Sequence, residues 1–144
     1  MKTILTIVFI LTYSTGFASF GDIENAVFLK CYDGDTCTFD LPGLHPPIGK
    51  KIGVRLDRID TPEIRGKCEV EKRAARAAKR FLNQGLKKAG KIKLINVKRG
   101  NYFRIVATII ADGVDMNALI VKHGLGVKYD GGKKRHSFGC GKKP

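Results

Sequence analysis

The fold of this chain is decided around residues 54–63, which read VRLDRIDTPE. Apolar and charged residues alternate at its start, which is typical of a strand because successive side chains point to opposite faces. The strand pattern ends at Pro62, since proline cannot donate a hydrogen bond to a sheet. Arg55, Asp60 and Glu63 therefore stand where a rigid element gives way to a loop. Such a set suits an anionic ligand, although an ordinary charged strand end has the same composition.

Strand patterns lie on both sides of this stretch. We expect strands over Val27–Tyr32, Thr36–Leu41, Ile52–Ile59, Lys91–Val97 and Arg104–Ile110. Asp33-Gly34-Asp35 predicts a tight turn between the first two strands, because Asp-Gly is a preferred hairpin turn. Residues 42–51 contain three prolines and two glycines, which predicts an irregular loop.

Helices are expected over Glu69–Ala89 and Met116–His123. In the first, apolar residues recur at three- and four-residue spacing and Gly90 ends the pattern. These residues are Val70, Ala74, Ala77, Ala78, Phe81 and Leu82. Asp115 is a suitable N-cap for the second helix. Five strands with a long helix between the third and fourth predict a β-rich α+β fold, a five-stranded Greek-key barrel of the oligonucleotide/oligosaccharide-binding type.

The first residues of the chain differ from the rest in composition. A short basic start is followed by an uncharged apolar run over residues 4–17 and by small residues. This pattern predicts a secretory signal peptide over residues 1–18, cleaved after Ala18, and hence a secreted or periplasmic protein. A retained membrane anchor is the alternative, although the run is short for a bilayer. Residues 19–144 then form one domain, with a barrel core over about 27–129 and a basic, glycine-rich tail over 130–144.

Charge and cysteines restrict the partners and the compartment. The formal charge is +14, from 27 basic and 13 acidic residues, which indicates a polyanionic partner without specifying a reaction. Four cysteines in an exported chain predict disulfide bonds, for which three pairings exist. Cys31 and Cys37 stand symmetrically about Gly34, so a hairpin turn would place them face to face and leave Cys68 to pair with Cys140. A zinc site is disfavoured because no Cys-x2-Cys spacing occurs.

Three polar clusters stand at the ends of predicted strands. They are Asp33-Gly34-Asp35-Thr36, Arg55 with Asp60-Thr61-Pro62-Glu63, and Tyr102-Phe103-Arg104. Each by itself is a common turn or strand end. Together they meet the needs of phosphodiester hydrolysis: carboxylates for a divalent cation, a base for the attacking water, and arginines for the charge on the phosphate.

These clusters resemble the motifs of the thermonuclease (staphylococcal nuclease) family over about Val27–Tyr129. The similarity rests on the three clusters in the family's order, together with Val54-Arg55-Leu56, Ile59, Glu71-Lys72, Ala74, Ala78, Phe81, Asp112-Gly113 and Gly124-Leu125. It implies the barrel fold and a calcium-dependent endonuclease that hydrolyses DNA and RNA and leaves 3′-phosphate ends.

The resemblance also implies the residues that bind the metal. Asp35 and Asp60 match the calcium-binding carboxylates of the family. Thr61 matches the residue that contributes its backbone carbonyl. Asp33 matches a group beside the metal that does not bind it directly.

The remaining site residues follow from the same match. Glu63 matches the proposed general base, and Arg55 and Arg104 match the arginines that bind the phosphate. Tyr102 and Tyr129 are candidates for contacting the nucleotide. The substrates implied are DNA and RNA, and we expect a monomer without stable membrane association once the signal is removed.

The chain departs from the family's pattern in places. Phe103 stands where the family more often has glycine, and the tail after Leu125 lacks the third helix of the staphylococcal enzyme. The four cysteines are not part of that enzyme's pattern either.

Two other classes of protein compete with a nuclease. A non-catalytic module of the same fold would be expected to have lost one of the site residues, yet the chain retains Asp35, Arg55, Asp60, Glu63 and Arg104. A cationic membrane-active protein would need none of them. The sequence therefore favours an enzyme.

Overall fold

The computed structural model describes residues 20–134 and 138–141 of the 144-residue chain. The expected signal peptide over residues 1–18 lies outside the described residues. Within the part that is described, no helix is long and apolar enough to cross a membrane.

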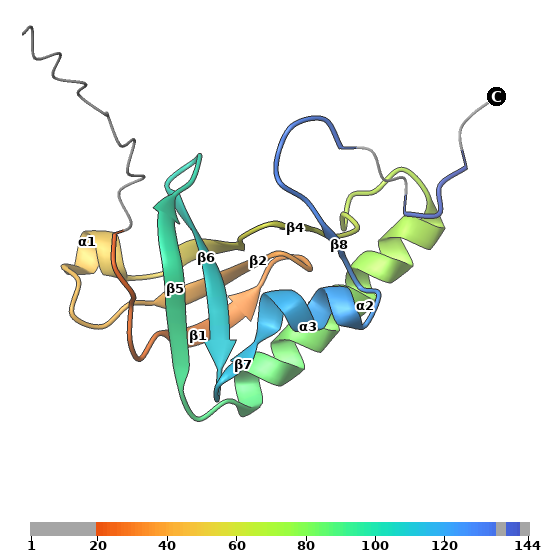
Figure 1. Ribbon diagram of the computed structural model, residues 1–144. Coiled ribbons are helices and arrows are strands. Elements are labelled where there is room, and N and C mark those ends of the chain that lie inside the picture. Colours follow the sequence, from red (N-terminus) through yellow and green to blue (C-terminus); the bar gives the residue numbers. More distant parts are fainter. Residues whose placement is uncertain (1–19, 135–137, 142–144) are drawn as a thin grey trace, which may run out of the picture.

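A mixed β-sheet forms the centre of the molecule (Figure 1). Its path runs through β1 (Val27–Cys31), β2 (Thr36–Asp40), β3 (Ile52–Leu56), β6 (Arg104–Ala111) and β5 (Ile92–Arg99). Neighbouring strands are antiparallel except for β3 and β6, which run parallel. Each expected strand range overlaps one of these strands, although β5 and β6 extend past the expected ends, and the β-rich class with helices is confirmed. The described residues hold eight strands, however, because three two-residue strands add to the expected five.

The strand pairings do not close this sheet into the barrel that the sequence predicted. β1 and β5 are the two ends of the path. The irregular segment 20–26 lies along β5 instead, where Ile23 and Leu94 exchange backbone hydrogen bonds of 2.8 and 2.9 Å. Gly21 and Asn25 have φ values of 77° and 55°, which a regular strand does not accommodate. The two ends are therefore linked through an irregular segment, not through strand pairing.

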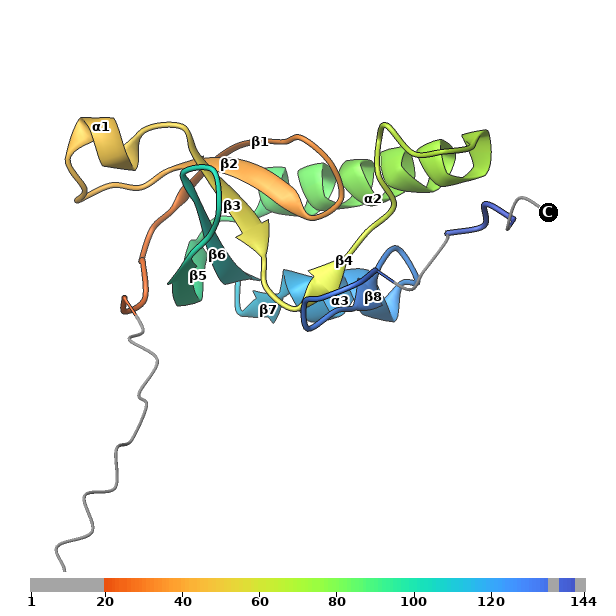
Figure 2. The same ribbon diagram turned by 90° about the horizontal axis from the view of Figure 1, so that it is seen from above.

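The expected strand Ile52–Ile59 is divided in two. β3 ends at Leu56, and Arg58 has a φ of 56°, so the chain turns before β4 (Ile59–Asp60). β4 pairs with β8 (Val127–Lys128), a strand that the aperiodic tail did not predict (Figure 2). A third short strand, β7 (Val114–Asp115), pairs with the end of β6. The turn at Arg58 thus brings the Asp60 segment beside the C-terminal segment.

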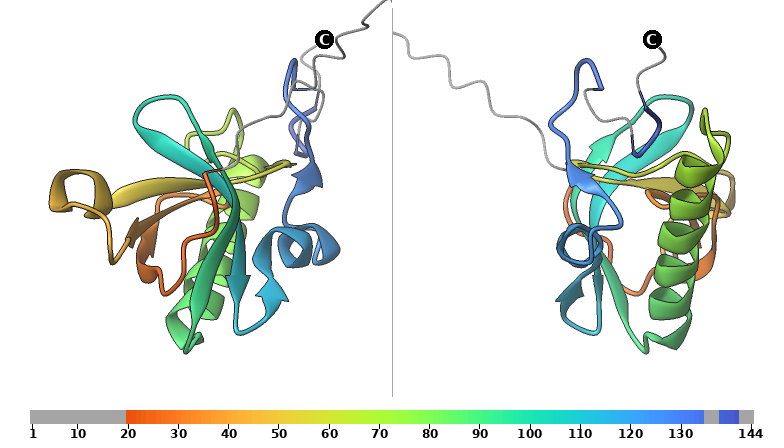
Figure 3. Two further views of the ribbon diagram at one scale, coloured as in Figure 1. Left: turned by 60° about the vertical axis from the view of Figure 1, so that its left-hand side comes forward. Right: turned by 90° about the vertical axis from the view of Figure 1, so that its right-hand side faces the viewer.

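Helix α2 (Glu69–Lys88) lies along the sheet beside β1 and contacts α3 (Met116–Lys122) (Figure 3). Its fully buried residues are Ala75, Ala78, Leu82 and Leu86. The predicted stripe was therefore wrong in part: Ala74, Ala77 and Phe81 are only partly buried and Val70 is 48% exposed. Alanines occupy two adjacent stripes of this helix, so spacing by itself did not identify the buried one. A one-turn helix, α1 (Pro46–Gly49), forms inside the loop expected to be irregular.

The hydrophobic core fills the space between the sheet and these helices. Its largest fully buried apolar side chains are Phe39, Leu56, Leu82, Leu86, Leu94, Ile109, Ile120 and Val54. Burial of each such side chain stabilises the fold by about 1.5–3 kcal/mol. Because Leu56 and Val54 are anchored in this core, the intervening Arg55 is presented on the opposite face of β3.

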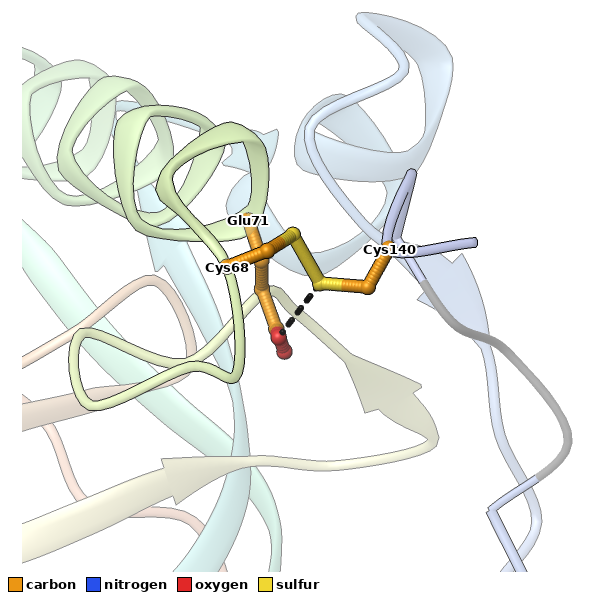
Figure 4. Close-up of side chains that lie close together, drawn as sticks. All are labelled: Cys68, Glu71 and Cys140. Carbon is orange, nitrogen blue, oxygen red and sulfur yellow. Dashed lines mark hydrogen bonds between the residues drawn. A yellow bond between two sulfur atoms is a disulfide. The ribbon is translucent and has the colours of Figure 1, made fainter. Parts of the chain in front are cut away.

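Both disulfide bonds follow the preferred pairing. Cys31 and Cys37 lie opposite each other in the register of β1 and β2 and are bonded. Cys68, which immediately precedes α2, is bonded to Cys140. The second bond therefore holds the end of the described chain against the start of the long helix (Figure 4).

Removal of each disulfide bond should lower the free energy of unfolding, by a different amount for each bond. Loop-closure entropy predicts that replacing Cys68 and Cys140 by serine lowers the free energy of unfolding by about 4 kcal/mol and that replacing Cys31 and Cys37 lowers it by about 2 kcal/mol. The difference arises because the sequence separations are 72 and 6 residues. Chemical denaturation of both double variants measures these values, and the reverse order would contradict the prediction.

Candidate active site

The turn between β1 and β2 is packed tightly against the segment that follows β4. A Cβ atom on Gly34 would lie 2.6 Å from Ala78 Cβ and 2.8 Å from Thr61 Oγ1, so no other residue fits there. This close approach brings Asp35 to the Asp60 segment. Asp35 is 4% exposed, and Asp60 and Thr61 are 1% and 2% exposed. The structure therefore gathers the predicted metal-binding residues in one buried place.

Arg55 lies between the two buried carboxylates. Its Nη2 atom is 2.8 Å from Asp35 Oδ2 and 3.6 Å from Asp60 Oδ1. Its Nη1 atom donates a hydrogen bond of 3.2 Å to Asp35 Oδ1, which also accepts one of 2.9 Å from Thr36 Oγ1. This two-point contact fixes the planes of the guanidinium and the Asp35 carboxylate relative to each other.

The contact with Arg55 does not fully compensate the burial of the Asp35 carboxylate. Burial, followed by the nearby charge of Asp33, raises the pKa of Asp35 to about 7, whereas Arg55 and the hydrogen bond from Thr36 act in the opposite direction. Asp33 also accepts a 3.2 Å hydrogen bond from the Asp35 backbone nitrogen. Asp33 therefore lies beside Asp35 and contacts its backbone.

A lysine that sequence reasoning did not identify completes the cluster. Lys134 Nζ lies 2.9 Å from Asp60 Oδ1 and 2.7 Å from Glu63 Oε1. The hydrogen bond from Lys134 lowers the pKa of Glu63 below its ordinary value. No signal in the sequence distinguished this lysine from the other basic residues of the tail, because its contact depends on how the tail folds.

Asp60 Oδ1 is a buried side-chain oxygen without a hydrogen-bond donor in the part of the chain that the structure describes. Among buried side-chain nitrogen and oxygen atoms of the described residues, it has no hydrogen bond. Lys134 Nζ is close enough for an ion pair, but the ammonium does not lie in a direction suited to a hydrogen bond. A buried, charged oxygen without a directed partner carries a free-energy cost that a closely bound cation would remove.

The cluster fits a hard divalent cation. Calcium and magnesium prefer oxygen ligands, and Asp35 and Asp60 present two buried carboxylates, one of them with an unsatisfied oxygen. A second group of polar side chains also has a spacing that could suit a metal, formed by Cys68, Glu71 and Cys140 (Figure 4). The two sulfur atoms there are bonded to each other, so they are not thiolates and cannot bind a metal.

Arg104 lies on the same face as Arg55 but apart from the carboxylates. It pairs with Gly53 in the parallel register, and a Cβ on Gly53 would lie 3.0 Å from Arg104 Cγ. Its Nε atom donates a 3.3 Å hydrogen bond to the Asn101 carbonyl, and its guanidinium lies 5.7 Å from the centre of the Tyr102 ring. Because Arg104 pairs with Gly53, two residues before Arg55 on β3, the backbone positions of the two arginines are offset by roughly 7 Å along the strand direction and lie on neighbouring strands.

The turn before Arg104 explains the departure at Phe103. Tyr102 and Phe103 both have a φ of 57° and are 89% and 69% exposed. Glycine adopts this left-handed region without strain, which gives a physical reason for the glycine that the thermonuclease pattern more often has there. Phe103 immediately precedes Arg104, which begins β6, and it lines an open apolar pocket that also includes Ile23 and Leu41.

Tyr129 lies on another side of the cluster, directly after β8. Its backbone nitrogen donates a 3.0 Å hydrogen bond to the Arg58 carbonyl. Tyr129, Arg55, Arg58 and Lys98 line an open pocket of about 610 Å³. Arg55 belongs both to the lining of this pocket and to the cluster. Tyr102 precedes β6 and Tyr129 follows β8, so the two candidates for nucleotide contact lie on different segments.

Comparison with known proteins identifies a family for this chain. The model of the family described as Staphylococcal nuclease homologue matches residues 53–138, more than half of the chain. The chain belongs to the family of staphylococcal nuclease homologues. No curated protein that was compared with the chain matches it. Membership indicates a nuclease or nucleic-acid-binding function and an oligonucleotide-binding type of fold.

The stability of the metal-free protein should depend on the ionisation of Asp35. Its folded pKa of about 7 exceeds the ordinary value of 3.8. Its contribution to stability is therefore fully present below about pH 4 and is lost as the pH rises through about 7. In chelator, the free energy of unfolding of the wild type should fall more between these pH values than that of Asp35→Asn. Urea denaturation across this range measures both, and parallel pH profiles would contradict the assignment.

Proposed function

We propose that this chain is a secreted, calcium-dependent endonuclease that hydrolyses phosphodiester bonds of DNA and RNA and leaves 3′-phosphate ends. The observation that carries this proposal is the buried pair of Asp35 and Asp60 on either side of Arg55, with Glu63 beside them. Membership in the nuclease family and the charge of +14 support it.

The buried carboxylates form the proposed calcium site. Asp35, Asp60 and the backbone carbonyl of Thr61 would hold calcium, which supplies a Lewis acid for a phosphoryl oxygen. Asp33 orients Asp35 by accepting the hydrogen bond from its backbone nitrogen. Burial excludes water from the two carboxylates, which strengthens their attraction for a cation.

Glu63 acts on the attacking water. Its side chain is 61% exposed, so water and substrate reach it. Because Lys134 lowers the pKa of Glu63, the carboxylate is ionised at neutral pH and accepts a proton, as a general base requires.

The arginines act on the phosphate. A product with a 3′-phosphate end forms when water attacks phosphorus and the bond to the 5′-oxygen breaks. Negative charge then accumulates on the phosphate oxygens and on the 5′-oxygen, which is the leaving group. Arg55 faces the cluster and is partly exposed, and Arg104 lies next along the same face. Their planar guanidinium groups suit two-point contacts with phosphate oxygens.

The compartment and assembly belong to the same proposal. Residues 1–18 act as a secretory signal that is cleaved after Ala18, and the mature protein is a secreted or periplasmic monomer without stable membrane association. Two disulfide bonds support export, because such bonds persist in oxidising compartments.

Metal dependence tests the reaction and the ligand assignment together. The purified protein should digest DNA and RNA with calcium and lose this activity in chelator. Asp35→Ala should raise the calcium concentration for half-maximal rate by about tenfold or more, since even groups that support a metal ligand contribute this much. Asp40→Ala is the matched control, because Asp40 contacts Lys50 and Lys51 instead. An unchanged calcium requirement would remove Asp35 from the site, and binding without digestion would favour a non-catalytic module.

Loss of the general base should slow the reaction without unfolding the protein. Glu63→Gln should lower kcat by a factor on the order of 10². Glu69→Gln provides a control, because Glu69 is an exposed carboxylate paired with Lys72 on α2. Rates at saturating calcium measure the effect, and a wild-type rate in Glu63→Gln would show that Glu63 is not the base.

A further inference from the structure

The C-terminal segment places an ammonium group inside the carboxylate cluster. Lys134 Nζ contacts Asp60 Oδ1 at 2.9 Å and Glu63 Oε1 at 2.7 Å. The lysine side chain is 43% exposed, yet it reaches an aspartate side chain that is only 2% exposed. A partly exposed side chain thus brings its ammonium to a buried carboxylate.

Lys134 is held there by anchors on both sides of it in the chain. Before it, β8 pairs with β4, and Tyr129 donates a hydrogen bond to the Arg58 carbonyl. After it, Cys140 is bonded to Cys68 at the start of α2. A side chain confined between two such anchors has a high effective concentration at its contact, so this contact forms at little entropic cost.

The ammonium does not satisfy the cluster. Asp33, Asp35, Asp60 and Glu63 bring four carboxyl groups together, against the positive charges of Arg55 and Lys134. Asp60 Oδ1 still has no hydrogen bond among the described residues. The cluster therefore retains attraction for a further cation, and the lysine is a weaker partner than one that approaches Asp60 in a suitable direction.

An ammonium and a divalent cation would compete for this oxygen. Calcium binds carboxylate oxygens at about 2.3–2.6 Å, with several oxygens converging on it. An ammonium 2.9 Å from the same oxygen would occupy part of that space and repel the divalent charge. Charge repulsion would therefore favour displacement of Lys134 when a metal binds at Asp60.

We propose that Lys134 is a tethered cation that occupies the cluster in the metal-free protein and competes with the divalent cation for Asp60. This inference rests on the proposed metal site and adds its regulation by the chain itself. Lys134 compensates the buried charge of Asp60 when metal is absent, and it lowers the affinity of the site for calcium. The Cys68–Cys140 bond, which keeps Lys134 close, strengthens this competition.

Calcium titration by calorimetry, without nucleic acid, tests the proposal on the mature protein with its disulfides intact. Lys134→Met removes the contact, and Lys133→Met is the matched control because it removes the same charge from the exposed neighbouring position. Lys134→Met should bind calcium on the order of tenfold more tightly than Lys133→Met, as expected for loss of a close charge contact. Equal or weaker binding by Lys134→Met would overturn the proposal.

Thermal unfolding gives a second readout. In chelator, Lys134→Met should have a lower Tm than Lys133→Met, because Asp60 has lost its ammonium partner. Saturating calcium should abolish this difference, since the metal then compensates Asp60 in both variants. A Tm difference that persists in calcium would indicate a purely structural lysine, and equal Tm values in chelator would show that the contact does not form. Either result would overturn the proposal.

Replacement of both Cys68 and Cys140 by serine tests the tether. This variant should also bind calcium more tightly than the wild type, and unchanged affinity would overturn the contribution of the disulfide. Failure of the proposed function is distinguishable, because a protein that binds calcium without cleaving nucleic acid refutes the nuclease and still reports on Lys134. Absence of calcium binding in every variant would refute both.

Discussion

Burial of two carboxylates around one guanidinium is the constraint on which this site depends. Asp35 and Asp60 are almost fully buried, and a buried charge is stable only when it is paired. Arg55 reaches both, yet the pKa of Asp35 stays raised to about 7 and Asp60 Oδ1 lacks a directed partner among the described residues. The cluster therefore attracts cations, whether an ion from solvent or the ammonium of Lys134.

The fold creates this incompletely compensated pair of carboxylates by bringing distant segments together. Gly34 lets the first hairpin turn approach Thr61 more closely than any side chain would permit. Arg58, which has a left-handed backbone conformation, turns the chain after β3 so that Asp60 lies beside the C-terminal segment. The Cys68–Cys140 bond then holds that segment next to the long helix. The tight turn and the left-handed residue cost free energy that the core of the sheet and helices offsets, whereas the disulfide bond itself adds stability.

Local patterns predicted most of the elements correctly. Alternation gave the five main strands, and apolar spacing with Gly90 gave α2 to within one residue of its observed end. The predictions were wrong where contacts between distant segments determine the local structure. The strand expected through Ile59 breaks at Arg58, and β8 forms only because β4 offers an edge to pair with. The barrel was expected to close by strand pairing, but the segment before β1 meets β5 in an irregular conformation.

The sequence by itself determined which groups are present: the aspartates of the first turn, the arginine and acids around residues 55–63, and the cysteine pairing about Gly34. These follow from strand periodicity and turn chemistry, which act over a few residues. Only the tertiary structure decided that Lys134 enters the cluster and that Arg104 lies beside it without a contact to the carboxylates. Such contacts join residues that are far apart in the chain, and they depend on the packing of the whole domain, which no local pattern encodes.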